Sequence, residues 1–461
     1  MTKIHKHMFR QYDIRGHVNK DEINEDTIGF IGRAFGTFLL RRNIPQTVVG
    51  HDFREYSPKL HKAFILGVLS TGCNVIDVGM CLTPMLYYAQ YHFKSKGGAM
   101  ITASHNPNGW SGVKLGCGYS YTLIGDEIKE MYDLVETDDF FRGKGNYEKR
   151  EIKQAYKDMI KNKIKLKKPM KVVLECGNGT AGAFAPDILR EIGCEVVELF
   201  CNLDARFPHH DPNPESKIVK EILTQNVKML GADIGVGLDG DGDRLGVVDE
   251  QGNNIWSDRI CILLARQALQ KHPGGKIVFD IKCTKALEED IKVHGGIPIM
   301  WKTGHSHIKK KAHEEKAVFA GERSGHFFVM DDYYGYDDGV FGAAKLIAYL
   351  SEQEEPFSKI IAKTPCYEIT PTIDVPCADE HKYNVSEKLA EIFRKKYPVI
   401  EHSGTRVIFE NGWGLVRPSS NTPNLVLVFE GQTQENIAQY KKIFREEFAK
   451  FPEISSEWIN E

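Results

Sequence analysis

The sequence lacks any long hydrophobic run and any marked excess of charge of one sign. No apolar stretch reaches the roughly 18 residues that a membrane-spanning helix needs, and the opening stretch MTKIHKHMFRQYDIRG lacks the apolar core of a signal peptide. The formal net charge is only -3, so no overall field attracts nucleic acid or a membrane surface. We therefore expect a cytoplasmic protein with neither nucleic acid nor membrane as a partner.

Closely spaced cysteines are also missing. The 10 cysteines are scattered and form no CxxC pair, which argues against a zinc framework and a small disulfide scaffold. Free thiols in a reducing cytoplasm are expected instead. With 41% hydrophobic and 27% charged residues, a chain of 461 residues has a globular composition and is expected to form about two to four domains.

A weak internal repeat organises the first three quarters of the chain. Residues 47–79, 171–200 and 276–304 each run as a β-branched strand, a polar or glycine-rich loop, a helix, a glycine stop and a second strand. This β-α-β order with short apolar strands is typical of parallel strands covered by helices. Three such units about 100 residues apart indicate three related α/β domains.

The pattern changes near residue 367. The strands TRVIFE, GWGLVRPS and NLVLVFE follow one another without crossover helices, which indicates a small antiparallel sheet and an α+β domain. The last helix gathers apolar side chains on one face at roughly helical spacing. These side chains are Ile437, Tyr440, Phe444, Phe448 and Phe451. The predicted domains are residues 1–149, 150–253, 254–366 and 367–461.

A serine follows the apolar strand GGAMI in the segment TASHNP, residues 102–107. A loop just past the carboxyl end of a strand is where α/β sheets place reactive groups, so Ser104 is a candidate nucleophile. Taken alone, the segment is better explained as a serine capping a turn before Asn-Pro. The neighbouring His105 does not indicate a hydrolase triad, because the GxSxG elbow is missing.

The segment GLDGDGDR, residues 237–244, is more specific. Asp239, Asp241 and Asp243 alternate with glycines that let the backbone curl, so the three carboxylates can converge on one hard cation. An EF-hand loop is the rival, since Glu250 falls at its twelfth position. Arg244 replaces the glycine of its sixth position, and the flanks ADIGVGL and LGVVDE read as strands. A solvated acidic turn is the remaining alternative.

Two further polar loops are weaker signals. GERSGH, residues 321–326, groups Glu322, Ser324 and His326, which suit hydrogen bonds to adjacent sugar hydroxyls, although a polar turn explains it equally well. RPSSNTP, residues 417–423, offers an arginine fork and hydroxyl donors to a phosphate, with a capped hairpin loop as the alternative.

Together these segments resemble the α-D-phosphohexomutase superfamily, most closely its bacterial phosphomannomutase/phosphoglucomutase subgroup. FRQYDIRG resembles the family's opening motif, TASHNP its phosphoserine loop, DGDGDR its metal loop, GERSGH its sugar loop and RPSSNTP its phosphate loop. DIKC and WKTGHS also resemble segments of that subgroup. The resemblance covers nearly the whole chain in order, and it implies four domains around a central active-site cleft. In chain order these domains would carry the phosphoserine, the metal, the sugar-recognition loop and the phosphate-binding loop.

The resemblance implies an isomerase that interconverts hexose 1-phosphate and hexose 6-phosphate, of mannose or glucose. Ser104 would carry a phosphoryl group, and Mg²⁺ held by Asp239, Asp241 and Asp243 would bind an oxygen of that group on Ser104. Arg244 would neutralise further charge during transfer. The phosphoryl group would pass to the free sugar hydroxyl, giving a hexose 1,6-bisphosphate that also serves as activator, with positioning and charge neutralisation dominating the transfer.

Further roles come from the resemblance alone. Lys114 and His305 would be the general acid and base, and Arg15 and His105 would join the catalytic groups. The implied substrate-binding residues are Tyr12, Lys282, Glu322, Ser324, His326, Arg417, Ser419, Ser420 and Asn421.

The sequence departs from the family pattern at two places. Arg323 stands where the mannose/glucose subgroup often has methionine and glucosamine enzymes have glutamine. Because arginine matches neither pattern, the identity of the preferred hexose stays open. The phosphate loop usually reads Arg-x-Ser-(Gly or Asn)-Thr, and here Ser420 and Asn421 occupy its fourth and fifth positions. Both can still donate hydrogen bonds to phosphate. A phosphoglucosamine mutase therefore remains an alternative.

Two other classes are rivals. A metal-dependent sugar phosphatase would use Ser104 as a transient nucleophile, but it would not need the separate basic loop around Arg417. A catalytically silent sugar-phosphate sensor would bind ligand without labelling Ser104. The oligomeric state stays open.

Overall fold

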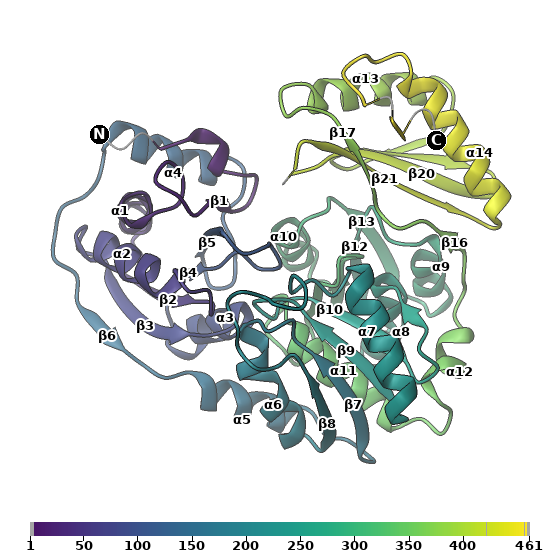
Figure 1. Ribbon diagram of the computed structural model, residues 1–461, viewed down its shortest axis with the longest axis horizontal. Helices are drawn as coiled ribbons and strands as arrows, with labels where there is room; N and C mark the ends of the chain where they lie inside the picture. Colours follow the sequence, from purple (N-terminus) through teal and green to yellow (C-terminus); the bar gives the residue numbers. More distant parts are fainter. Residues whose placement is uncertain (1–3, 421, 456, 459–461) are drawn as a thin grey trace.

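The computed structural model of the protein describes residues 4–420, 422–455 and 457–458. Its strands form four sheets covered by helices (Figure 1). The predicted fold class is confirmed, because three mixed α/β sheets precede a C-terminal α+β unit. Within the described residues no helix is both long and apolar enough to cross a membrane. The ten cysteines are free thiols.

The first sheet has six strands in the order β1-β5-β4-β2-β3-β6. These strands are β1 (Ile14–His17), β2 (Gln46–His51), β3 (Asn74–Met80), β4 (Gly97–Ile101), β5 (Trp110–Cys117) and β6 (Tyr147–Lys149). Its helices are η1 (Lys6–Met8), α1 (Glu25–Arg41), α2 (Ser57–Leu69), α3 (Thr83–His92) and α4 (Asp126–Thr137).

The second sheet has five strands in the order β11-β10-β9-β7-β8. These strands are β7 (Met170–Glu175), β8 (Cys194–Leu199), β9 (Ile234–Leu238), β10 (Leu245–Asp249) and β11 (Asn254–Ile255). Its helices are α5 (Lys153–Lys163), η2 (Thr180–Ala183), α6 (Ala185–Glu191) and α7 (Lys217–Leu230). Helix α7 begins at the cap of Ser216, which accepts a hydrogen bond from Val219 N, and ends at Gly231 with φ +59°.

The third sheet has four strands in the order β13-β12-β14-β15. These strands are β12 (Lys276–Asp280), β13 (Ile297–Trp301), β14 (Phe319–Gly321) and β15 (Phe327–Val329). Its helices are α8 (Ser257–Lys271), α9 (Lys285–Val293), α10 (His305–Glu315), α11 (Gly339–Ser351) and α12 (Phe357–Ala362). Helix α11 contacts β9 and β10 of the second sheet as well as β15 of the third, so one hydrophobic core runs through both sheets.

The fourth sheet is antiparallel, as predicted. Its strands are β16 (Glu368–Ile369), β17 (Ile373–Pro376), β18 (Val399–Glu401), β19 (Thr405–Phe409), β20 (Gly412–Pro418) and β21 (Asn424–Gly431). Its helices are α13 (Lys382–Arg394) and α14 (Gln434–Phe448). The predicted apolar face of α14 is buried at Ile437, Tyr440, Phe444 and Phe448, whereas Phe451 follows the helix and is half-buried.

The three repeat units form parallel pairs as predicted, namely β2 with β3, β7 with β8 and β12 with β13. The sheets are nevertheless mixed, because β4, β9 and β14 each return through a tight loop into an antiparallel strand. Four of the motifs occupy hairpin loops between antiparallel strands. These hairpins are β4–β5 for TASHNP, β9–β10 for DGDGDR, β14–β15 for GERSGH and β20–β21 for the arginine loop.

Candidate active site

Ser104 lies in the β4–β5 loop and reaches the acidic loop of the second sheet. Its side-chain Oγ donates to Asp239 Oδ2 at 2.9 Å and lies 3.1 Å from His105 Nδ1. The residue is buried, and its φ of +52° places it in the left-handed region. Such a conformation is costly for a residue with a Cβ and persists where the surroundings hold it. The loop therefore presents the serine oxygen in a fixed position.

Two buried residues that sequence analysis missed support this loop from behind. Arg54 donates to the carbonyl oxygens of Ser104 at 3.0 Å and Asn106 at 2.5 Å. Asp52 accepts from the backbone N–H of Ala103 at 3.2 Å. Both residues lie in the repeat segment just after β2, whose carboxyl end meets that of the parallel strand β4. That shared sheet edge was the available signal.

Arg15 and His105 flank the serine. Arg15 donates to Asn106 Oδ1 at 2.7 Å and pairs with Asp13 at 2.7 Å. Burial, reinforced by the charges of Arg244 and Arg15, holds the pKa of His105 well below its usual range. His105 is therefore neutral at pH 7, and the structure places both predicted residues next to Ser104.

The carboxylates of Asp239, Asp241 and Asp243 form a fully buried cluster, with ligand atoms within 4.8 Å of one another. Their flanks are strands β9 and β10 rather than helices, so the EF-hand alternative is wrong. Burial and the two neighbouring carboxylates raise the pKa of Asp239 well above its usual range. Glycine is required at position 240, because a Cβ there would lie 2.5 Å from Ser104 O.

This cluster fits a hard divalent cation. Among the described residues, Asp241 Oδ1 and Asp243 Oδ1 are buried without a hydrogen-bond partner. Carboxylate oxygens are the ligands that Mg²⁺ and Ca²⁺ prefer, and a bound cation would relieve the repulsion within the cluster. The acidic loop is therefore able to hold a metal ion beside Ser104.

Lys114 projects from β5 into the same cluster. Its Nζ lies 2.8 Å from Asp241 Oδ2 and 2.5 Å from Asp243 Oδ2. Burial alone would lower the lysine pKa, but the carboxylates outweigh burial and raise the pKa above its usual range. Thr83 and Thr102, which sequence analysis did not single out, also donate to Asp241 Oδ2. The first and second sheets are thus joined through Asp241.

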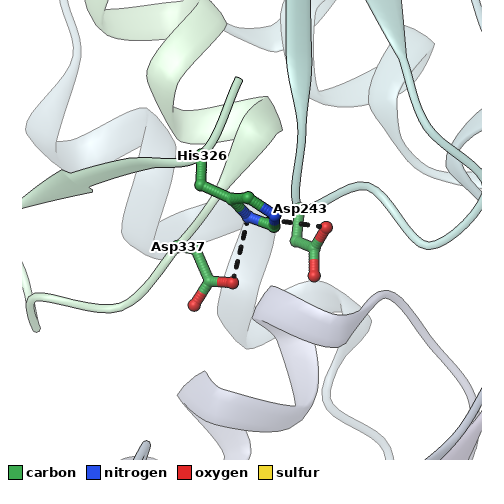
Figure 2. Close-up of side chains that lie close together, drawn as sticks. All are labelled: Asp243, His326 and Asp337. Atoms are coloured by element: carbon green, nitrogen blue, oxygen red, sulfur yellow. Dashed lines mark ion pairs between the residues drawn. The ribbon is translucent and has the colours of Figure 1, made fainter. Parts of the chain in front are cut away.

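Two histidines of the third sheet lie close to this cluster. His326, from the β14–β15 loop, accepts from Arg244 Nε at 3.0 Å through its Nε2. His305 is the first residue of α10, and burial lowers its pKa to about 4. Figure 2 shows His326 with Asp337 and Asp243, whose carboxylate oxygens lie 3.3 and 3.8 Å from the same ring nitrogen, Nδ1. Asp337 had no distinguishing motif in the sequence.

The sugar loop presents Glu322 to the same region. Glu322 Oε1 accepts from Gly304 N at 2.6 Å, and its Oε2 is buried without a partner among the described residues. Burial raises the pKa of this carboxyl group above its usual range. Ser324 is half-buried in the same loop, and Lys282 Nζ lies 3.9 Å from Asp280. Unused acceptor capacity on Glu322 suits a ligand with hydroxyl donors.

Arg323 is in the same loop, but its guanidinium contacts Asp258 and Thr370 rather than Glu322. Its positive charge therefore gives no reason to doubt the choice of hexose. Its guanidinium donates to Thr370 O at 2.8 Å and to Asp258 Oδ2 at 3.4 Å. The same group lies 4.6 Å from the centroid of the Trp256 ring. Arg323 is buried and links the third sheet to the segment that leads into the fourth.

The fourth sheet meets the first at the arginine loop. Arg417 donates to Ser420 Oγ at 3.3 Å, and Ser420 Oγ donates to Gln11 Oε1 at 3.2 Å. Tyr12 follows Gln11, and its ring lies 5.3 Å from that of His305. Ser419 is in the same loop. The predicted Asn421 lies outside the described residues.

The chain was compared with known protein families. Four domains match in order, each described as Phosphoglucomutase/phosphomannomutase. Alpha/beta/alpha domains I, II and III match residues 6–142, 154–252 and 256–367, and the C-terminal domain matches residues 373–447. These matches cover most of the chain.

Individual relatives agree with the domain matches. A phosphomannomutase/phosphoglucomutase of Pseudomonas putida is 42% identical over 451 residues, covering 97% of this chain and 96% of the relative. A phosphoglucomutase of Neisseria gonorrhoeae is 39% identical over 450 residues, covering 96% and 97%. The crystal structure of a phosphoglucomutase/phosphomannomutase family protein from Burkholderia thailandensis superimposes with a TM-score of 0.90 at 35% identity, covering 97% and 98%. The chain therefore belongs to the phosphoglucomutase/phosphomannomutase family of the α-D-phosphohexomutases, which its motifs resemble.

Proposed function

We propose that the protein is a phosphohexomutase that interconverts the 1-phosphates and 6-phosphates of mannose and glucose. The observation that carries this proposal is the hydrogen bond from Ser104 Oγ to Asp239 in a buried acidic cluster. That contact puts a nucleophilic oxygen beside a cation site, while the basic loop of Arg417 offers a second place for phosphate. A substrate phosphorylated at either end needs both sites.

The acidic loop would hold Mg²⁺ through Asp239, Asp241 and Asp243, with a phosphoryl oxygen on Ser104 as a further ligand. When bound, the ion would supply charge neutralisation at the transferring phosphoryl group. Arg244 lies beside this loop, with its Nε 4.0 Å from Asp239 Oδ2, and would stabilise the same charge. A hexose 1,6-bisphosphate would form as intermediate and would prime unphosphorylated protein.

The remaining groups would bind and orient the sugar. His305 is neutral, since its pKa is about 4, and would accept the proton of the attacking hydroxyl. Lys114 would act as the general acid. Arg15 and His105 would hold the serine loop in place. Hydroxyls would be bound by the sugar loop and phosphate by the arginine loop. The groups that would contact substrate are Tyr12, Lys282, Glu322, Ser324, His326, Arg417, Ser419, Ser420 and Asn421. The cytoplasmic location and the domain limits at residues 149, 253 and 366 stay predictions.

A substrate panel tests the choice of hexose. Glucose and mannose phosphates should be turned over with kcat/KM at least about tenfold above glucosamine phosphates. The physical reason is that Glu322 and Ser324 would bind hydroxyls common to glucose and mannose, whereas glucosamine carries at C2 an amino group whose charged form is costly to remove from water in a closed site. The measurement is kcat/KM for the three 1-phosphates under one set of conditions. Fastest turnover of glucosamine 1-phosphate would favour the phosphoglucosamine alternative, and release of free phosphate would favour a phosphatase.

The same panel tests the role of Arg323. Arg323→Met should leave the ratio of kcat/KM values among the three sugars within about twofold of wild type, because the guanidinium contacts Asp258 and Thr370 rather than Glu322. It should lower the free energy of unfolding by about 3 kcal/mol, because Asp258 keeps a buried charge without its partner. Urea unfolding measures the second effect. A tenfold change in sugar preference would show that Arg323 reaches the substrate.

A further inference from the structure

Asp337 is a buried carboxylate that contacts three ionisable side chains at once. Its Oδ2 lies 3.2 Å from His305 Nδ1 and 3.3 Å from His326 Nδ1 (Figure 2). Its Oδ1 accepts from Lys309 Nζ at 3.0 Å. Asp337 is fully buried and His305 and His326 nearly so, so these contacts form away from solvent. Buried polar groups of this kind are costly unless partners satisfy them.

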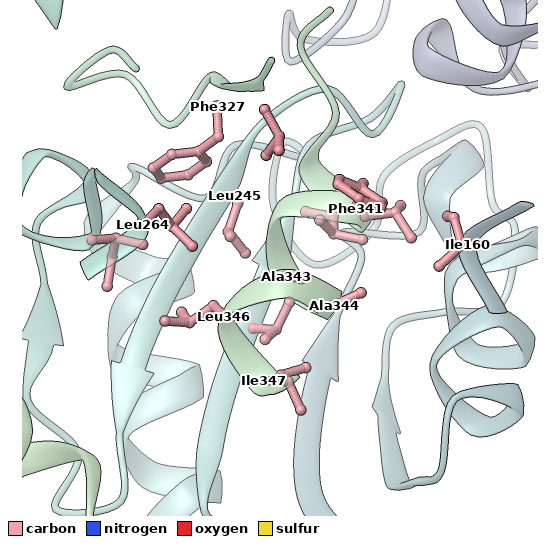
Figure 3. Packing of buried hydrophobic residues seen from close by; sticks show 14 of the residues in the cluster. Ile160, Leu245, Leu264, Phe327, Phe341, Ala343, Ala344, Leu346 and Ile347 are labelled. Atoms are coloured by element: carbon pink, nitrogen blue, oxygen red, sulfur yellow. The ribbon is translucent and has the colours of Figure 1, made fainter. Parts of the chain in front are cut away.

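Helix α11 fixes the position of Asp337. Asp338 caps this helix by accepting from Phe341 N at 2.8 Å, and Asp337 immediately precedes that cap. Figure 3 shows Phe341, Ala344 and Ile347 of α11 among the packed side chains of the core. A carboxylate anchored to a packed helix can hold a ring in one orientation.

The donor or acceptor character of the facing groups then determines which nitrogen of each ring carries the proton. Arg244 Nε–H can only donate, so His326 Nε2 must accept and its proton must lie on Nδ1, facing Asp337. A carboxylate oxygen only accepts, so His305 also carries its proton on Nδ1. The acceptor of the neutral His305 ring is then Nε2.

Lys309 balances the carboxylate. Its side chain is fully buried, and its ammonium lies 4.0 Å from the centroid of the Tyr87 ring. Asp243, His326 and Asp337 lie close enough to one another to hold a metal ion. Because Lys309 already supplies a positive charge to Asp337, the Asp337 carboxylate needs no metal ion for neutrality.

We propose that Asp337 is a positioning residue that holds His305 and His326 in the Nδ1–H tautomer. In this state His305 offers Nε2 as a proton acceptor, while His326 uses Nε2 to orient the guanidinium of Arg244. One carboxylate outside the recognised motifs thereby determines which nitrogen of His305 accepts a proton and how the Arg244 guanidinium is oriented. The consequence for turnover rests on the proposed function, whereas the assignment of tautomers does not.

The test is Asp337→Asn, observed by NMR of protein labelled with ¹⁵N-histidine. The Asn oxygen should face Lys309, which can only donate, so the amide NH₂ would face both histidines. His305 Nδ1 would then have to accept, and its proton would move to Nε2. His326 Nε2 still accepts from Arg244 Nε–H, so His326 would keep its proton on Nδ1. We expect the His305 tautomer to invert, the His326 tautomer to persist and kcat to fall about 100-fold. The matched control is Asp338→Asn, an adjacent buried carboxylate bonded by the hydroxyls of Tyr156 and Tyr333. It should leave tautomers and kcat unchanged.

Folded Asp337→Asn protein in which His305 is still in the Nδ1–H tautomer would overturn the proposal. If this variant does not fold, the double variant Asp337→Asn with Lys309→Met replaces it, because it removes both buried charges together. There the amide is free to turn, so a mixture of tautomers is expected, and wild-type tautomers with wild-type kcat would overturn the proposal. If the His305 tautomer inverts in Asp337→Asn but the wild type does not turn over sugar phosphates, the proposed function is wrong and this assignment stands.

Discussion

Ser104→Ala is expected to lower mutase turnover by about 10⁴-fold or more while leaving sugar-phosphate binding measurable. The serine oxygen would be the atom that carries the phosphoryl group, and removing a nucleophile abolishes the covalent route. Binding should persist because Glu322 and Arg417 lie on other loops. Alanine also keeps the Cβ that the left-handed backbone already tolerates. Turnover of glucose 1-phosphate and calorimetric binding of the same ligand measure the two effects.

A matched control is Ser111→Ala. Ser111 lies on β5 of the same sheet, and its hydroxyl is buried without a hydrogen-bond partner among the described residues. That variant should keep wild-type turnover. Intact-mass measurement should find one phosphoryl group on the wild type and none on Ser104→Ala. Full activity of Ser104→Ala would overturn the mechanism. Unphosphorylated wild type that gains no activity from glucose 1,6-bisphosphate would contradict the priming step.

The motifs predicted the contacts between sheets better than the strand pattern predicted the sheets. Ser104 and Asp239 are 135 residues apart in sequence, yet each was identified from a loop that follows an apolar strand. The returning strands β5, β10 and β15 were not anticipated as part of the repeat units, because no crossover helix marks them. These hairpins make three of the sheets mixed, and their loops meet through the contacts of Ser104 with Asp239 and of Arg244 with His326.

The supporting role of Asp337 could not be predicted from the sequence, for a physical reason. Asp337 acts through contacts with His305, His326 and Lys309 that only the folded chain brings together. A single aspartate next to a helix cap looks the same whether or not histidines pack against it. Arg323 is a second example, since its place in the sugar loop left the hexose open, whereas its guanidinium contacts Asp258 and Thr370. The direction of a side chain depends on the turn that carries it.

Asp239→Asn is expected to lower metal-dependent turnover by about 10³-fold without loss of stability in the absence of metal. Burial and the charges of Asp243 and Asp241 raise the pKa of Asp239 well above its usual range. A carboxyl whose pKa is higher in the folded state destabilises the fold as pH rises between the unfolded and folded values. At neutral pH the substitution removes that penalty. Asn also retains an oxygen for the N–H groups of Asp243 and Arg244, which Asp239 Oδ1 accepts now.

Thermal unfolding with EDTA and with Mg²⁺ separates the two effects. Mg²⁺ at about 100 times its Kd should stabilise the wild type by about 2.7 kcal/mol, because the ion binds only the folded cluster. Asp239→Asn should lose this gain and unfold in EDTA at or above the wild-type temperature. Asp249→Asn is the control, since Asp249 is a buried carboxylate at the far end of the same hairpin that bonds Gln251 and Asn253. It should keep the gain from Mg²⁺. Unfolding of Asp239→Asn far below the wild type in EDTA would show instead that the acidic loop is a structural element of the metal-free fold.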